Sequence, residues 1–289
     1  GIFAAILCSF TYVVAQIYGV GLITSRFTGL EFGIGVFVGL GGILVCSFLG
    51  GMRAVTWTQV AQYIILIIAY MTPVVLLSTS KTGVPIPQIM YGQALEQIHS
   101  LENTLGIAKH HSDAFVNAKG EYDPVAALNF FALIFCLMVG TASLPHILMR
   151  YFTAPSVKEA RDSVAWSLLF IFLLYFSAPA YAAFSKLEVY TNIIGRDLTA
   201  IRPWLFNWGE LGLIQICGKN AGSIDAIVAA CKAIAGHPGV VRLQDFVINT
   251  DVIVLSTPEI AGLPYVISGL VAAGGLAAAL STADGLLLA

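Results

Sequence analysis

Three polar side chains near the end of the chain, Ser281, Thr282 and Asp284, lie in a run of residues that is otherwise apolar or small. Ala278, Ser281 and Thr282 are spaced i, i+3 and i+4, so on a helix one carbonyl and two hydroxyls share a face. Transporters hold hard monovalent cations with oxygen ligands of this kind. Helical hydroxyls also bond back to the preceding turn without any ion. Both interpretations stay open at this point.

Asp284 needs a separate interpretation, because it lies two positions beyond Thr282 and therefore about 200° around a helix. A carboxylate within a lipid-like run is costly and is by default a candidate for function. We expect Asp284 either to contact water or a cation at the inner end of its helix, or to act in an ion relay.

A second polar group interrupts the apolar stretch "LMVGTASLPHILMRYF", at Gly140, Thr141, Ser143 and Pro145. Proline removes a backbone donor and clashes with the carbonyl four residues earlier, here that of Thr141. Unwound backbone at membrane depth survives where it is buried in protein or faces a cavity, and transporters bind substrates at such breaks. We expect Gly140, Thr141 and Ser143 to line a solute cavity. The alternative is a proline kink in which Thr141 or Ser143 satisfies the freed carbonyl.

The remaining patterns do not predict catalysis. In "KHHSDAF" His110, His111 and Asp113 could suggest a metal site, but the adjacent histidines do not share a helix face, and no cluster with metal-ligand spacing follows. The sequence shows no Ser-His-Asp constellation, Gly-rich phosphate loop or Cys-X-X-Cys pair. We therefore expect neither an enzyme nor a cofactor, and no metal ion other than sodium.

The composition shows what must position these residues: 58% of the residues are hydrophobic and only 10% are charged, with a mean hydropathy of +0.86. Spanning a bilayer takes about 20 apolar residues, and six charge-free windows are long enough: 1–25, 32–52, 54–80, 124–149, 163–185 and 260–283. These windows are apolar on every face, unlike the alternating strands of a barrel. The sequence predicts an all-α integral membrane protein with six transmembrane helices.

Loop charges predict the orientation of these helices. Alternating spans place four basic residues in short loops on one side: Arg53, Arg150, Lys158 and Arg161. Two long segments, 80–123 and 186–259, lie on the other side. Positive charge in short loops marks the cytoplasmic side, so we expect a multi-pass protein of the inner (plasma) membrane. The net charge of −2 gives no reason to expect a nucleic-acid partner.

Two further patterns predict packing. Gly35 and Gly39 have the small-xxx-small spacing of closely packed membrane helices. Cys217 and Cys231 share the second long segment, where they could form a disulfide that closes a loop of about 15 residues. Separate burial of the two thiols is the alternative.

Three ordered motifs resemble the sodium:solute symporter family, most closely its acetate-permease-like branch: "GGMRAVTWTQVAQYIIL", "GTASLPHILMRYFTAPSVKEAR" and the terminal "GLAAALSTADGLLLA". The resemblance implies the leucine-transporter fold, a bundle of two inverted five-helix repeats. The chain would be part of one transmembrane symporter domain. Its segments would be the last three helices of the first repeat (1–79), an outer segment (80–123), the first two helices of the second repeat (124–185), an outer segment (186–259) and the third helix of that repeat (260–289).

The same resemblance implies a sodium site on the eighth core helix. Its ligands here would be the carbonyl of Ala278 and the hydroxyls of Ser281 and Thr282, and their partners on the first core helix would precede Gly1. Several family members have an acidic residue where this sequence has Gln59. The neutral amide favours a single coupled ion.

We therefore expect a sodium-coupled symporter that imports a small solute, such as acetate or another short monocarboxylate. Its partners would be the solute, sodium and the lipid bilayer, and a small membrane partner subunit is left open. No basic residue lies inside a predicted span, so helix N-terminal amides at the Gly140–Pro145 break are the expected partners of a carboxylate. The alternatives are a symporter-like sensory domain of a membrane histidine kinase and, less favoured, a channel.

Overall fold

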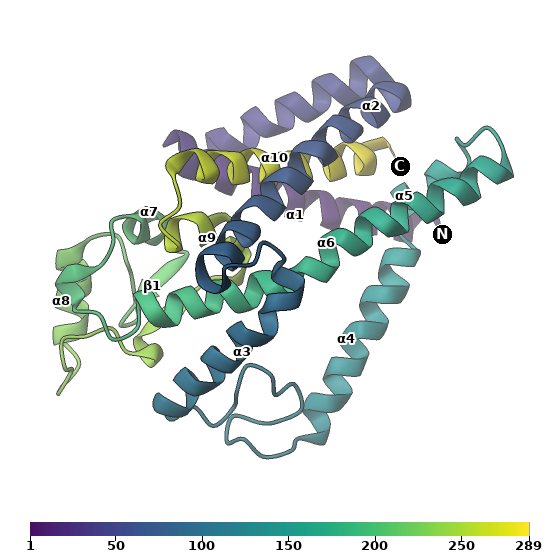
Figure 1. Cartoon of the computed structure of the whole chain (residues 1–289). Coiled ribbons are helices and arrows are strands. Elements are labelled where there is room, and N and C mark those ends of the chain that lie inside the picture. The colour runs from purple at the N-terminus through teal and green to yellow at the C-terminus, as the bar shows by residue number, and fades with distance from the viewer. Residues whose placement is uncertain (289) are drawn as a thin grey trace.

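Long apolar helices make up most of the computed structural model, which describes residues 1–288 (Figure 1). The main helices are α1 (Ile2–Thr28), α2 (Phe32–Thr82), α4 (Pro124–Ala142), α5 (Pro145–Tyr151), α6 (Val157–Asn192) and α10 (Tyr265–Leu288). Within the described residues, five stretches are long and apolar enough to cross a membrane: Ile2–Thr28, Leu49–Thr82, Pro124–Ala142, Val157–Asn192 and Tyr265–Leu287. The predicted helical membrane protein is confirmed.

The predicted count of six transmembrane helices is not confirmed, because the window 32–52 contains only a shorter apolar helix, Phe32–Val45. This helix and the next span are joined within α2 across a kink at Gly51, whose φ of 55° and ψ of −160° are not helical. Only glycine adopts such a backbone conformation at little cost. Gly51 therefore marks the predicted boundary between the second and third windows.

The last predicted span, 260–283, begins later than expected. Residues 253–260 form the separate helix α9 (Ile253–Ile260), and α10 begins at Tyr265. Gly262 has a φ of 69° and Pro264 stands directly before Tyr265. A left-handed glycine ends a helix, and a proline favours a new first turn, so the two elements cannot be one helix.

Helix α10 packs against both α1 and α2, and close contacts at glycines hold these helices together. A Cβ atom on Gly39 would lie 2.1 Å from Cγ1 of Val20, and one on Gly274 would lie 2.4 Å from Cβ of Ala69. Atoms cannot approach so closely, so both positions require glycine. The close packing predicted for Gly35 and Gly39 is confirmed.

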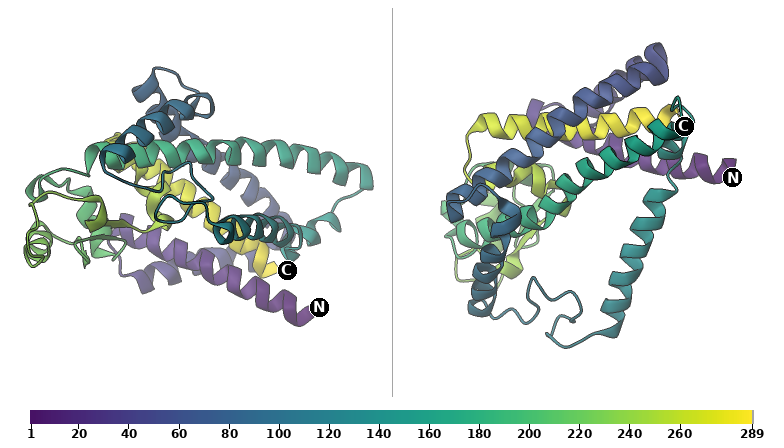
Figure 2. Two further views of the ribbon diagram at one scale, coloured as in Figure 1. Left: turned by 90° about the horizontal axis from the view of Figure 1, so that it is seen from below. Right: turned by 45° about the vertical axis from the view of Figure 1, so that its right-hand side comes forward.

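Helix α4 stands apart from this bundle (Figures 1 and 2) and has no buried residue. Its start is fixed locally, because the Asp123 carboxylate accepts from the Val125 amide at 2.9 Å and Pro124 occupies the first turn. The two ends of the chain and α5 lie at one end of the molecule (Figure 1). We call it the inner end, after the predicted orientation.

The two long connecting segments form the opposite end. Helix α3 (Pro87–Thr104) packs along α6. The second segment contains α7 (Trp204–Glu210), α8 (Ile224–Lys232), α9, the 3-10 helices Leu198–Ala200, Leu243–Asp245 and Thr250–Val252, and the strands β1 (Ile214–Ile216), β2 (Lys219–Asn220) and β3 (Phe246–Ile248). The strands form an antiparallel sheet in the order β2-β1-β3. The all-α prediction missed this small sheet.

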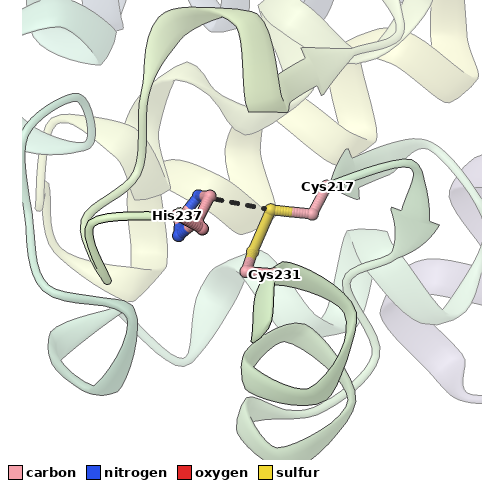
Figure 3. A group of neighbouring side chains, drawn as sticks. All are labelled: Cys217, Cys231 and His237. Atoms are coloured by element: carbon pink, nitrogen blue, oxygen red, sulfur yellow. Dashed lines mark hydrogen bonds between the residues drawn. A yellow bond between two sulfur atoms is a disulfide. The ribbon is translucent and has the colours of Figure 1, made fainter. Parts of the chain in front are cut away.

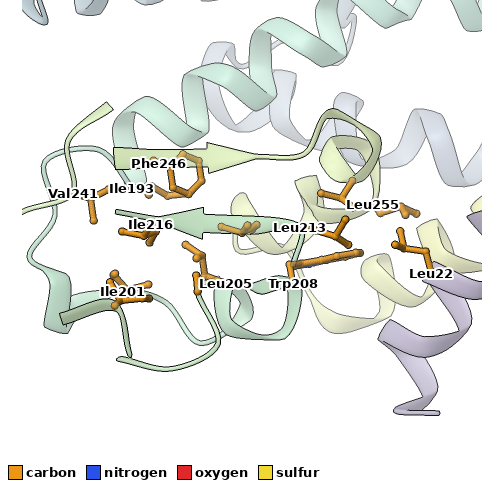
Figure 4. Packing of buried hydrophobic residues seen from close by; sticks show 14 of the residues in the cluster. Leu22, Ile193, Ile201, Leu205, Trp208, Leu213, Ile216, Val241, Phe246 and Leu255 are labelled. Carbon is orange, nitrogen blue, oxygen red and sulfur yellow. The ribbon is translucent and has the colours of Figure 1, made fainter. Parts of the chain in front are cut away.

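A hydrophobic core stabilises the second segment (Figure 4). Trp208, Ile214 and Ile216 are fully buried, and Ile216 lies opposite Phe246 in the β1–β3 pair. The same cluster includes Leu22 of α1 and Leu255 of α9. The outer segment is therefore packed on the ends of the membrane helices.

Candidate functional site

The three predicted sodium ligands converge on α10. The Ser281 hydroxyl donates to the Ala278 carbonyl at 2.9 Å, and the Thr282 hydroxyl donates to the same oxygen at 3.1 Å. The i, i+3, i+4 spacing therefore brings three oxygens together, as predicted. The hydroxyls bond back to the preceding turn, which is the arrangement of the alternative interpretation, and the sodium site itself stays a prediction.

A cavity of about 230 Å³ lies beside these hydroxyls, at the inner end of the bundle. Three helices supply its lining: Gln59, Tyr63 and Leu66 of α2, His146 and Arg150 of α5, and Ser281 and Thr282 of α10. The predicted sodium ligands thus share a water-accessible space with a guanidinium and an imidazole. Polar groups of this kind in a membrane protein mark a solute or ion pathway.

A chain of two hydrogen bonds connects the three helices at this cavity. Arg150 Nη2 donates to Gln59 Oε1, and Gln59 Nε2 donates to the backbone carbonyl of Ser281 at 2.5 Å. Gly285 of α10 lies beside the contact, because a Cβ atom there would be 3.4 Å from Arg150 Nη2 and 3.5 Å from Gln59 Nε2, both ordinary contact distances. Gln59 therefore positions both the guanidinium of Arg150 and the turn of α10 that carries the predicted sodium ligands.

Sequence reasoning missed the contribution of Arg150. Arg150 lies just outside the predicted span 124–149, so no basic residue was expected inside the bundle. Because the span breaks before Pro145, the short helix α5 brings the Arg150 guanidinium to Gln59 of α2. The signal that could have identified Arg150 is its position in the last turn of the short helix that begins at Pro145. Gln59 was singled out only as a departure from the family pattern, with no structural role assigned to it.

The predicted break in the fourth span is present. Helix α4 ends at Ala142, Leu144 is extended with a ψ of 123°, and α5 begins at Pro145. The Ser143 hydroxyl donates to the Gly140 carbonyl at 3.1 Å, and the Leu144 amide approaches the Thr141 carbonyl at 3.5 Å. Local groups therefore meet both carbonyls, but the Thr141 carbonyl is met by the Leu144 amide and not by the Thr141 or Ser143 hydroxyl of the kink alternative.

The structure does not bring the break residues to a described cavity. Gly140, Thr141 and Ser143 are exposed, and none of them lines the cavities found among the described residues. Their role in a solute cavity stays a prediction.

Ala278 also lines a larger cavity, of about 660 Å³, between α1 and α10. Thr11 and Gln16 of α1 contribute polar groups to it. Asp284 lines neither this cavity nor the inner one. Only 2% of Asp284 is exposed, so its carboxylate is not in contact with bulk water at the inner end of the helix. Its proposed relay role is not tested by its position.

The second outer segment contains a disulfide between Cys217 and Cys231, the first of the two predicted alternatives (Figure 3). His237 Nε2 lies 3.7 Å from Cys217 Sγ and 3.0 Å from Asp245 Oδ2, and its Nδ1 accepts from the Gly239 amide at 3.1 Å. Nδ1 is therefore unprotonated, and Nε2 carries the proton that Asp245 accepts. With both sulfurs bonded and Nε2 donating, this group does not offer metal ligands.

The histidines of "KHHSDAF" pair with nearby groups. His110 Nδ1 lies 3.4 Å from Asp113 Oδ2, and His111 Nδ1 lies 3.3 Å from Lys186 Nζ. Burial lowers the pKa of His111, and the charge of Lys186 lowers this pKa further. Glu102 completes the cluster, because it accepts from Lys186 at 2.6 Å. The contacts tie the first outer segment to α6.

Comparison with known proteins identifies the class of this chain. The model of the sodium:solute symporter family matches residues 1–199, so the chain belongs to this family. An uncharacterized symporter of Cupriavidus necator is 39% identical over 99% of this chain and 53% of its own length. A monocarboxylic acid transporter of Corynebacterium glutamicum is 31% identical over 57% of this chain and 30% of its own length.

No solved structure matches the chain. The chain spans about half of the first relative and less of the second. Both relatives are transporters, which agrees with the expectation that the protein is not an enzyme. Family and apolar helices together define a multi-pass membrane protein of the symporter class.

Proposed function

We propose that the chain is part of a sodium-coupled symporter of the plasma membrane that imports a short monocarboxylate such as acetate. One observation carries the proposal: the hydroxyls of Ser281 and Thr282 lie 2.9 and 3.1 Å from the carbonyl oxygen of Ala278, and both hydroxyl residues line a polar cavity. Three neutral oxygens on one helix face form half of a coordination shell for a hard monovalent cation. Residues outside this chain would supply the other half.

The solute class rests on two supports. A relative carries the name monocarboxylic acid transporter, and the cavity beside the proposed ion ligands contains the guanidinium of Arg150. A guanidinium suits a carboxylate because its N–H donors match the two oxygens. We also propose the leucine-transporter fold for the complete protein, with the broken fourth span opening the second repeat.

The energetics fit uptake driven by the sodium gradient. One sodium ion gains about 2.3 kcal/mol per 100 mV of membrane potential. When it moves with one carboxylate anion, the transported charge cancels and the membrane potential drops out. Accumulation of the acid then depends on the sodium concentration ratio alone, with sodium as the coupling ion that we propose.

The test is acetate uptake by the complete protein in proteoliposomes. An inward sodium gradient should accumulate labelled acetate above its external concentration, and equal sodium on both sides should abolish the accumulation. Acetate flux that ignores sodium would indicate a channel instead. Binding of acetate without any flux would favour the sensory-domain alternative.

A further inference from the structure

The inner cavity has a positively charged lining that the sodium site does not explain. Arg150 contributes a half-buried guanidinium and His146 an imidazole, while no described residue that lines this cavity carries a carboxylate. The guanidinium of Arg150 lines the same cavity as Ser281 and Thr282 and would repel a sodium ion there unless an anion lay beside it. The lining therefore points to an anionic ligand.

His146 supports the same conclusion independently. Its Nδ1 is buried and has no hydrogen-bond partner among the described groups. Its ring stacks on Tyr12 of α1, with the centroids 6.1 Å apart and the planes 20° from parallel. A buried ring nitrogen without a partner is costly. The His146 ring lines the cavity and is held in place by Tyr12, so a ligand oxygen that reaches Nδ1 would satisfy it.

Gln59 leaves the charge of Arg150 available to a ligand. The guanidinium has five N–H donors, so it can keep its bond to the neutral Gln59 amide and still bind a second acceptor with its remaining N–H groups. An acidic residue at position 59 would instead pair with Arg150 and neutralise it. The amide in this chain orients the guanidinium without neutralising it.

We propose that Arg150, oriented by Gln59 and assisted by His146, binds the carboxylate of the transported solute at the inner end of the bundle. This inference rests on the proposed function and gives the solute a binding site on its pathway to the cytoplasm. A cavity of about 230 Å³ is smaller than the roughly 300–1,000 Å³ of drug-sized ligand sites. It suits a solute of a few heavy atoms.

This binding position would also couple the release of the solute to the release of sodium. The carboxylate at Arg150 and the sodium ion at Ser281 and Thr282 would lie in one cavity, so each charge lowers the cost of the other. Their affinities are then linked reciprocally. Gln59 contacts both groups, through Arg150 Nη2 and the Ser281 carbonyl.

The experiment compares Arg150→Gln with Arg161→Gln in the complete protein, reconstituted so that the inner face is accessible. Arg161 has the same charge and the same predicted side, but it is exposed and does not line the cavity. At saturating sodium, Arg150→Gln should raise the half-saturation concentration for acetate at the inner face about 10- to 150-fold, the range expected for a lost charge-assisted contact. Arg161→Gln should leave it unchanged.

Two further variants keep the inference falsifiable if Arg150→Gln does not fold. Gln59→Glu places a carboxylate on the guanidinium and should weaken acetate binding as strongly as Arg150→Gln. Arg150→Lys keeps the charge without the planar fork and should give a smaller loss. Unchanged acetate half-saturation in these variants would mean that Arg150 only joins α5 to α2, and would overturn the inference. If the wild-type protein shows no sodium-driven acetate uptake, the proposed function itself is wrong.

Discussion

Gln59 on α2 donates a hydrogen bond of 2.5 Å to the backbone carbonyl of Ser281 on α10, across 222 positions of sequence. The hydroxyl of the same serine donates to the Ala278 carbonyl. Ser281 therefore joins a side chain of another helix to the turn that carries the proposed sodium ligands. Movement of α2 against α10 would change the geometry of this turn, which gives ion release a structural route.

The first prediction concerns the sodium ligands. Ser281→Ala or Thr282→Ala removes one oxygen and keeps a small side chain that favours a helix, so the protein should fold. Loss of a ligand at the scale of a charge-assisted contact, roughly 1.5–3 kcal/mol, predicts a sodium affinity about 10- to 150-fold weaker. Solute affinity should fall at low sodium and recover at high sodium, because the sites are linked. Uptake kinetics at varied sodium measure both effects.

Asp284→Asn provides the comparison for this pair. If Asp284→Asn alone abolishes sodium dependence, while the alanine variants keep the wild-type sodium half-saturation, the acid carries the coupling and the proposed ligands are wrong.

A second prediction concerns the broken span and uses two glycines. A Cβ atom on Gly140 meets nothing within 4 Å, whereas one on Gly39 would meet Val20 at 2.1 Å. Gly39→Leu should therefore destabilise the fold, by about 1–3 kcal/mol or more. Gly140→Leu should leave the melting temperature unchanged and yet reduce solute affinity, if the break faces the solute in the complete transporter. Unchanged solute affinity in a folded Gly140→Leu protein would leave the break as a simple kink.

A third prediction concerns orientation. Lys158 at the start of α6 and Lys219 on β2 are both exposed and lie in segments predicted on opposite sides. Single cysteines at these positions, in a background without Cys8 and Cys136, should react differently with an impermeant maleimide. With Cys46 also replaced, Lys219→Cys should be labelled in intact cells, and Lys158→Cys only after lysis. The reverse pattern would invert the proposed topology.

A fourth prediction concerns the acid stability of the second outer segment. Arg242 donates to Asp245 at 2.7 and 2.9 Å, and these bonds hold the pKa of Asp245 below its usual value. A lowered pKa stabilises the fold above the unfolded pKa of about 3.9, and this contribution is lost as pH falls through the lowered pKa.

The measurement is the melting temperature of wild type and Asp245→Asn between pH 6 and pH 2. The wild-type advantage should be largest at the upper end and shrink below about pH 4, where the Asp245 carboxylate of the unfolded chain protonates. A difference between the two proteins that stays constant over this range would contradict the assignment. His237, which also contacts Asp245, stays unchanged in both.

Features that depend on neighbouring residues were predictable from the sequence. The convergence of Ser281 and Thr282 on Ala278 follows from helical spacing alone. Close packing at Gly39 follows from the absence of a side chain. The break at Pro145 follows from the missing amide proton. Each of these three features can be predicted without knowing which helices pack against one another.

Features that join distant segments were not predictable in this way. Nothing local indicates that Arg150 would contact Gln59, which lies 91 positions away, or that Gln59 would contact α10. The strands β1 to β3 have two or three residues each, too few to show an alternating pattern. Charge-free windows also say nothing of where a helix ends, so the start of α10 at Tyr265 was missed.

The central claim is that sodium and the carboxylate cross the membrane together, and the most direct test is sodium uptake driven by the solute. Proteoliposomes with the complete protein and no sodium gradient receive an inward acetate gradient, and entry of radioactive sodium is measured. Acetate should stimulate sodium entry in wild type, and Ser281→Ala should reduce this entry at low sodium and regain it at high sodium. Acetate entry that brings no sodium with it in wild type would contradict the account.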